Sequence, residues 1–247
     1  MSDQRLEQDI HPPKALVTGA TSGLGKAIAL RLARDGAEII VVGRNAARGA
    51  GTVAEITAAG GTARFIAADV SDPADIQRLV KEAGTIDVLV NNAGHSLWGP
   101  TEDLDVMDFD ALFASNVRAP FYLVAAFAPM MAANGTGSIV NIGSMAGSIG
   151  MAGGAAYGAT KAALASLTKA WTAEYSPRGV RVNAVAPGPV YTRPEGRELF
   201  DRLGATTALN RAADPEEIAE VVAFLASPRA SYVTGAIIAA DGGRTAI

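Results

Sequence analysis

A tyrosine and a lysine four positions apart, Tyr157 and Lys161, carry the groups in this sequence that are best suited to acid–base chemistry. The segment around them has a helical pattern, so residues four apart lie on the same helix face. A free phenol has a pKa of about 10, too high for ready proton exchange at neutral pH, and a nearby ammonium group favours the phenolate. The spacing therefore predicts that Lys161 lowers the pKa of Tyr157, which donates or accepts a proton.

A glycine-rich loop follows the first predicted strand and leads straight into a helix. It reads Thr18-Gly19-Ala20-Thr21-Ser22-Gly23-Leu24-Gly25. Glycines let a backbone turn sharply and approach a pyrophosphate, while the free N–H groups and the dipole of the helix start attract negative charge. The loop indicates a dinucleotide site; taken alone, it is also compatible with a tight turn that binds nothing.

The elements that must position these residues are strands alternating with helices. One example is the helix predicted for Leu24–Arg34, which has a single apolar stripe. Such alternation implies a parallel sheet covered on both faces. We therefore expect a single-domain α/β fold, a doubly wound Rossmann-type sheet of about seven strands. The predicted strands are Ala15–Thr18, Glu38–Val42, Arg64–Ala67, Val88–Asn91, Ser138–Ile142, Arg181–Val185 and Ala236–Ala239.

The composition of the 247 residues excludes several kinds of site. Net charge is −4 and the basic residues are scattered, which disfavours a nucleic-acid partner. The absence of cysteine excludes disulfides and thiolate zinc sites and fits a cytoplasmic location. His11 and His95 form no metal-ligand pattern, so we expect no metal. Met1–Pro13 is predicted to be a flexible leader before a dinucleotide-binding catalytic domain at 14–247.

A long uncharged run extends from Ala119 to Thr160. Its most apolar part, Phe121–Ala133, contains Pro129 and is shorter than the ~20 apolar residues that a membrane span needs. The run therefore predicts a buried helix and no membrane partner.

Further motifs appear in a fixed order along almost the whole chain. They are Asp69-Val70, Asn91-Asn92-Ala93-Gly94, Asn116, Ser144 and Pro187-Gly188-x3-Thr192, together with Tyr157-x3-Lys161 and the glycine loop. In this order the set resembles the short-chain dehydrogenase/reductase family, and within it β-ketoacyl carrier-protein reductases and sugar or polyol dehydrogenases.

This resemblance implies an oxidoreductase that moves a hydride between NAD(P)(H) and a carbonyl or secondary alcohol. Tyr157 would be the general acid or base, and Lys161 would also bind the nicotinamide ribose. Ser144 follows a predicted strand, and its hydroxyl could donate to the substrate oxygen as charge develops there. Asn116 would hold a water that links Lys161 to solvent, through its side chain or backbone. The alternative is a nucleotide-binding regulatory or scaffolding protein without turnover, but such relatives usually lose the Tyr or Lys that this chain keeps.

The family's cofactor contacts also fall on residues of this sequence. Asp69 would bond the adenine amino group, Asn91 would hold neighbouring strands or the adenine ribose side, and Thr192 would bond the carboxamide. The predicted cofactor residues are Gly19, Thr21, Ser22, Gly23, Leu24, Gly25, Arg44, Asn45, Asp69, Val70, Asn91, Ala93, Gly94, Tyr157, Lys161, Pro187, Gly188, Val190 and Thr192.

The end of the second predicted strand favours NADP over NAD, with NAD still possible. NAD-preferring relatives carry an acidic residue there that bonds the ribose 2′-OH. Here Gly43 leaves room and Arg44 follows, and its guanidinium could bond a 2′-phosphate through two donors. The alternative is that Arg44 is only a solvated loop residue that does not bind the cofactor.

The family's substrate pocket would be built from three segments of this chain. The predicted pocket residues are His95, Ser96, Trp98, Met145, Met151 and Tyr191, an apolar set with a few polar groups that is typical of small-molecule sites. Carrier-protein reductases typically place basic residues near 131–134 and 172–174 for docking. This chain has none at those positions, which argues against a carrier-protein substrate.

A homotetramer is expected from the apolar helices. A helix that is apolar all round must be buried on more than one side. The family commonly pairs the helices corresponding to Ala119–Ala133 and Tyr157–Tyr175 across a two-fold axis.

Overall fold

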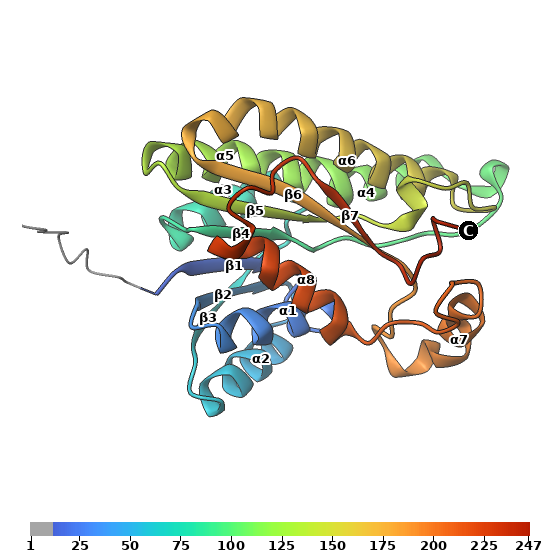
Figure 1. Ribbon diagram of the computed structural model, residues 1–247, viewed down its shortest axis with the longest axis horizontal. Helices are drawn as coiled ribbons and strands as arrows, with labels where there is room; N and C mark the ends of the chain where they lie inside the picture. The colour runs from blue at the N-terminus through green and yellow to red at the C-terminus, as the bar shows by residue number, and fades with distance from the viewer. Residues whose placement is uncertain (1–11) are drawn as a thin grey trace, which may run out of the picture.

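The computed structural model describes residues 12–247, so residues 1–11 of the predicted leader lie outside the described part. The chain forms one seven-stranded parallel sheet with helices on both faces, in the strand order β3-β2-β1-β4-β5-β6-β7 (Figure 1). This is the expected Rossmann-type α/β fold. The strands are β1 (Lys14–Thr18), β2 (Glu38–Gly43), β3 (Thr62–Ala67), β4 (Val88–Asn91), β5 (Gly137–Ile142), β6 (Val180–Pro187) and β7 (Ile237–Ala240).

Eight α-helices are found within residues 12–247. They are α1 (Gly23–Arg34), α2 (Ala46–Ala58), α3 (Pro73–Ala83), α4 (Val106–Phe113), α5 (Ala119–Ala133), α6 (Ala155–Tyr175), α7 (Arg197–Gly204) and α8 (Pro215–Ala226). A π-helical turn, η2 (Ala114–Arg118), joins α4 to α5.

Every predicted strand is present. Only Val88–Asn91 has the predicted ends, β1, β2 and β5 are each one residue longer than predicted, and the remaining three differ as follows. The strand predicted from Arg64 begins at Thr62, because 62–67 pairs in full with 38–43 of β2. The strand predicted as Arg181–Val185 is the longer β6, and the last strand begins at Ile237, one residue later than predicted. Backbone pairing sets these ends, and apolar patterns do not detect it.

The core has two halves, one on each face of the sheet, and alternate residues of β1 enter different halves. Ala15 and Val17 pack with α1, α2 and α8, whereas Leu16 packs with α3, α5 and α6. Burial on both faces explains why the central strands read as nearly continuous apolar runs.

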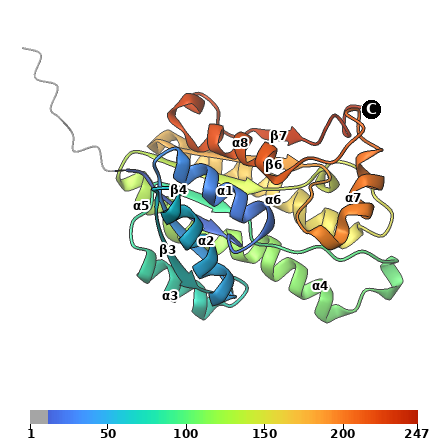
Figure 2. The same cartoon turned by 90° about the horizontal axis from the view of Figure 1, so that it is seen from below.

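β1 and β4 are neighbours in the sheet. Successive strands are added on one side of β1 (β2, then β3) and afterwards on the opposite side, beginning with β4. The loops that follow these strands therefore diverge and leave a crevice at their carboxyl ends. Figure 2 shows α7 and the start of α4 at the end of the molecule toward which the strands run. The predicted motifs that follow the strands meet at this edge.

The helix from Val106 to Ala133 is continuous and is long and apolar enough to cross a membrane by length and composition. Half of its most apolar 18-residue stretch is buried in the protein. Leu123 and Phe127 pack in the core beside the sheet, whereas Phe121 and Tyr122 are 44% and 50% exposed. The helix thus has a core face, as predicted, and an exposed aromatic face.

Candidate active site

A cleft of about 1190 Å³ opens at the carboxyl ends of β1, β2 and β4. Most of the predicted cofactor residues line it. They are Gly19, Thr21, Ser22, Gly23, Leu24, Gly25, Arg44, Asp69, Val70, Ala93, Gly94 and Thr192. These residues follow five different strands, β1, β2, β3, β4 and β6, and their convergence makes this cleft the candidate cofactor site.

The glycine loop has the shape that a bound pyrophosphate needs. Gly19 and Gly23 have φ values of +66° and +52°, a region that favours glycine. A Cβ on Gly25 would collide with the Gly19 carbonyl, so α1 can begin this close to the loop only with glycine there. Ser22, the N-cap residue of α1, makes no side-chain cap bond, and the first N–H groups of the helix are available to an anion. The residues present therefore fit a dinucleotide.

Thr18 joins the loops that follow β1 and β4. Its hydroxyl accepts hydrogen bonds from the N–H groups of Asn92 (3.0 Å) and Ala93 (2.9 Å) and donates to the Val90 carbonyl (3.2 Å). The Asn92 side chain also donates to the Thr18 carbonyl at 2.8 Å. These bonds hold the two walls of the cleft at a set separation.

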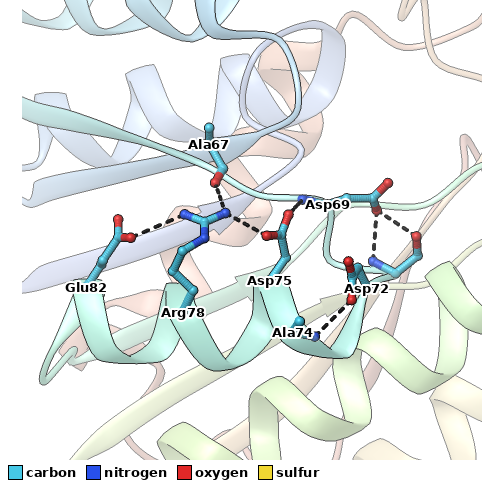
Figure 3. A network of polar contacts seen from close by, with 8 residues as sticks. Ala67, Asp69, Asp72, Ala74, Asp75, Arg78 and Glu82 are labelled. Carbon is cyan, nitrogen blue, oxygen red and sulfur yellow. Dashed lines mark hydrogen bonds and ion pairs between the residues drawn. The ribbon is translucent and has the colours of Figure 1, made fainter.

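Asp69 is held by the first turns of α3 (Figure 3). Its N–H donates to Asp75 Oδ2 at 2.8 Å, and Arg78 bonds both Asp75 and the Ala67 carbonyl at 2.7 Å. Oδ1 of Asp69 accepts two bonds from Ser71, and these bonds help to keep the pKa of this carboxyl below its usual value although burial acts to raise it. Asp69 is thus a fixed, ionised acceptor at the cleft edge.

Two arginines lie at the end of β2. Arg44 is 79% exposed and lies 3.6 Å from Asp69 Oδ2. Arg48, one turn into α2, lines the same cleft. Sequence reasoning missed Arg48, although a second basic residue four positions after Arg44 was an available signal. The cleft therefore presents two guanidinium groups at this corner.

The predicted catalytic residues come together beside the cleft. Ser144 follows β5, and Tyr157 and Lys161 lie on α6. Burial raises the pKa of Tyr157 above its usual value, and the Ser144 hydroxyl lowers it in part. The Lys161 ammonium is buried, donates to the Ile142 carbonyl at 2.9 Å and lies 5.7 Å from the centre of the Tyr157 ring. Burial lowers the pKa of Lys161 to about 8.

The expectation that Lys161 lowers the pKa of Tyr157 is corrected by this arrangement. Desolvation is the largest influence on the pKa of the phenol and raises it, and the Ser144 hydroxyl opposes this in part. Lys161 is itself desolvated and directed to a backbone carbonyl, because β5 ends directly beneath it. The i,i+4 spacing placed the two residues on one face but did not predict this desolvation.

Asn116 lies in the π-helical turn, where the Ala119 N–H donates to the Ala114 carbonyl, five residues back. Its side chain is fully buried and satisfied. Nδ2 donates to the His95 carbonyl (2.9 Å) and to Thr160 Oγ1 (3.1 Å), and Oδ1 accepts from the His95 N–H (3.1 Å). Sequence reasoning missed this π-helical turn. Sequence reasoning also missed Thr160, which ties Asn116 to α6.

Some predicted cofactor residues do not line the cleft. Asn91 donates to Asn141 at 2.8 Å, which favours its predicted strand-linking role. Asn45 caps α2 through a bond from Arg48 N at 2.9 Å. Val190 is buried and bridges to Ala213, while Pro187 and Gly188 pack by the end of β7.

The predicted substrate residues separate into groups. His95 lines the cofactor cleft and bonds Ser115 through Nδ1 at 3.0 Å, whereas Trp98 lies 5.7 Å from the Tyr157 ring. Tyr191 bonds Asp201 of α7 at 2.5 Å. Of the remaining three, Ser96 is exposed, Met151 is half-buried and Met145 is buried.

Known proteins share this fold and much of the sequence. The enoyl-(acyl carrier protein) reductase family matches residues 19–245. Galactitol 2-dehydrogenase (L-tagatose-forming) from Cereibacter sphaeroides is 42% identical over 94% of this chain and 94% of its own length. A solved short-chain dehydrogenase/reductase family protein is 48% identical, with a TM-score of 0.91 over 97% of this chain and 100% of that chain.

A second solved structure bears on the cofactor. A blue fluorescent protein from a metagenomic library, in complex with NADPH, is 39% identical, with a TM-score of 0.88 over 96% of this chain and 99% of that chain. Together with the glycine-lined cleft, these likenesses extend over nearly the whole chain. The protein is therefore an NAD(P)-dependent oxidoreductase and belongs to the short-chain dehydrogenase/reductase family.

Proposed function

We propose that the protein transfers a hydride between NADP(H) and a small carbonyl compound or secondary alcohol, with Tyr157 as the general acid or base. The observation that carries this proposal is the placement of Tyr157, Ser144 and Lys161 together, with Lys161 Nζ 3.8 Å from where a Cβ on the cleft-lining Gly94 would lie. No observation favours the regulatory alternative, because the proton-transfer residues are all present.

The bound nicotinamide would supply or accept the hydride at the substrate carbon. In the reductive direction, the Tyr157 hydroxyl gives its proton to the carbonyl oxygen. Its raised pKa keeps the phenol protonated at neutral pH, as a general acid requires. Ser144 donates a hydrogen bond to the same oxygen and stabilises the charge that develops on it.

Lys161 and Asn116 have supporting roles in this proposal. With a pKa of about 8, the Lys161 ammonium can return a proton toward Tyr157 near neutral pH and can donate to the cofactor ribose. Asn116 clamps the His95 backbone to Thr160 of α6, so it fixes the loop after β4 relative to the catalytic helix. A backbone group of Asn116 remains our candidate for holding the relay water.

We propose a preference for NADP over NAD because Arg44 and Arg48 both line the cleft at the end of β2. No carboxylate ends this strand, where Gly43 stands. Asp69 is engaged with Ser71, and the exposed guanidinium of Arg44 at the cleft edge could bond a 2′-phosphate through two donors.

We further propose a cytoplasmic homotetramer. The exposed aromatic face of α5, Phe121 and Tyr122, lies beside Trp171 of α6, with the Phe121 and Trp171 ring centres 6.2 Å apart. Exposed aromatic area of this kind commonly marks a protein interface. A chain without cysteine is compatible with a reducing compartment.

The test of the proposed function is a panel of ketones and alcohols with NADPH or NADP⁺, followed by absorbance of the reduced nicotinamide. Tyr157→Phe should remove nearly all turnover and leave dinucleotide binding close to normal. Tyr232→Phe is the matched control, because Tyr232 is fully exposed. If Tyr157→Phe kept more than about a tenth of the wild-type kcat on a substrate with rate-limiting hydride transfer, Tyr157 would not be the general acid.

A further inference from the structure

An indole ring forms a wall beside the proposed proton donor. The centres of the Trp98 and Tyr157 rings are 5.7 Å apart and the ring planes are tilted by 51°. Trp98 is 50% exposed, so a broad apolar face next to the phenol is open to a ligand. An exposed indole at this place is the kind of surface that a substrate's apolar group can cover.

The position of Trp98 depends on a glycine in another loop. A Cβ on Gly154 would come within 2.6 Å of Trp98 Cζ3. Gly154 has a φ of −106°, which any residue can adopt, so the glycine is required for space rather than for its backbone conformation. The Gly99 N–H donates to the Gly153 carbonyl at 3.0 Å and joins the two loops at the same point. The indole is thus seated in a notch that only glycine leaves open.

The two loops that meet at this wall carry no formal charge. Residues 96–101 and 143–156, which form the two joined loops, contain no Asp, Glu, Lys or Arg. The charged residues that directly follow the first loop, Glu102 and Asp103, are exposed. A charged group placed against Trp98 would lose hydration without gaining a partner from these loops.

We propose that Trp98, seated on Gly154, is the specificity-determining residue of this enzyme. It selects an uncharged ketone or secondary alcohol that carries a ring or another bulky apolar group on the reacting carbon. Trp98 contacts that group directly, and Gly154 is a positioning residue that acts through Trp98. This inference rests on the proposed hydride transfer with Tyr157 as the proton donor.

The test compares cyclohexyl methyl ketone with 2-butanone as substrates of the full-length protein with NADPH. Trp98→Ala should lower kcat/KM for the ring ketone about tenfold, which corresponds to about 1.4 kcal/mol, and change the value for 2-butanone less than about threefold. Trp98→Phe should recover most of the loss. Gly154→Ala should reduce the ratio of kcat/KM for the ring ketone to kcat/KM for 2-butanone. It should also alter the tryptophan emission spectrum, because the added methyl group displaces the indole. Gly150→Ala is the matched control, because a Cβ there meets nothing within 4 Å.

Different results would contradict the assignment of Trp98 and the proposed hydride transfer. If wild type reduced both ketones but Trp98→Ala left the ratio of kcat/KM values unchanged, the assignment of Trp98 would be wrong. An unchanged ratio in Gly154→Ala with a shifted emission spectrum would also overturn it. If neither ketone nor any other member of the substrate panel were reduced by wild type, the proposed function itself would fail, and the inference with it. Thermal melting of each variant separates these results from misfolding.

Discussion

Replacing Arg44 by aspartate should reverse the cofactor preference from NADPH to NADH. In the wild type, the guanidinium of Arg44 forms an exposed ion pair with Asp69 at 3.6 Å, too long for a good hydrogen bond, so its donors can turn to a 2′-phosphate. The new carboxylate would repel that phosphate and could accept a hydrogen bond from the 2′-OH of NADH.

The exposure of Arg44 sets the size of this effect. A hydrogen bond to a charged group contributes about 1.5 to 3 kcal/mol, and the 79% exposure of Arg44 places its contribution at the lower end because solvent screens it. Losing the bond should therefore lower kcat/KM for NADPH roughly tenfold. Repulsion by the aspartate adds to this loss, so the NADPH/NADH ratio should change by about a hundredfold in total. Arg48 remains in the cleft and limits the loss; Arg44→Ala alone should have the smaller effect.

The assay is kcat/KM for NADPH and NADH with a saturating ketone at low and at high ionic strength. The preference should weaken as salt rises, since the screening length falls from about 10 Å at 0.1 M to about 3 Å at 1 M. Arg34→Asp is the control, because Arg34 is exposed at the end of α1 and does not line the cleft. A wild-type ratio that favours NADH, or an Arg44→Asp ratio within twofold of wild type, would refute the reasoning.

Three other outcomes follow from the geometry. Ser144→Ala removes the hydroxyl that lowers the pKa of Tyr157, so the acidic limb of the pH profile of kcat/KM for alcohol oxidation should move to higher pH; an unmoved limb would contradict this. Arg211 lowers the pKa of Glu217 from 4.5 to about 2, so the pair's stabilisation is complete above pH 4.5 and is lost as pH falls toward 2. In urea titrations Glu217→Gln should therefore lower the free energy of unfolding by up to about 1 kcal/mol at pH 7 and by less at pH 3.5. An equal decrease at both pH values would be inconsistent with this ion pair. Phe121→Glu should lower the tetrameric mass measured by light scattering, whereas Lys81→Glu on the exposed side of α3 should not; a monomeric wild type would exclude the tetramer.

The fold and the phosphate end of the cofactor site were readable from the sequence because they depend on local patterns. Apolar runs with intervening helical stripes specify a parallel sheet, and the positions of Gly19, Gly23 and Gly25 specify a turn that closely approaches a helix start. The order of motifs such as Ser144 and Tyr157-x3-Lys161 resembles that of the short-chain dehydrogenase/reductase family, and this resemblance indicated the family. Each of these signals lies within a few residues of chain or in a fixed order along it.

Tertiary structure decided the features that depend on contacts between distant segments. Burial of Tyr157 and Lys161 opposes their ionisation, and neither residue type nor spacing reveals how much water a folded site excludes. Thr160 bonds Asn116 from 44 positions away, and Gly154 leaves room for the side chain of Trp98 from a different loop. Such pairings are set by how helices and loops pack at the sheet edge, so only the assembled molecule shows which residues support the catalytic ones.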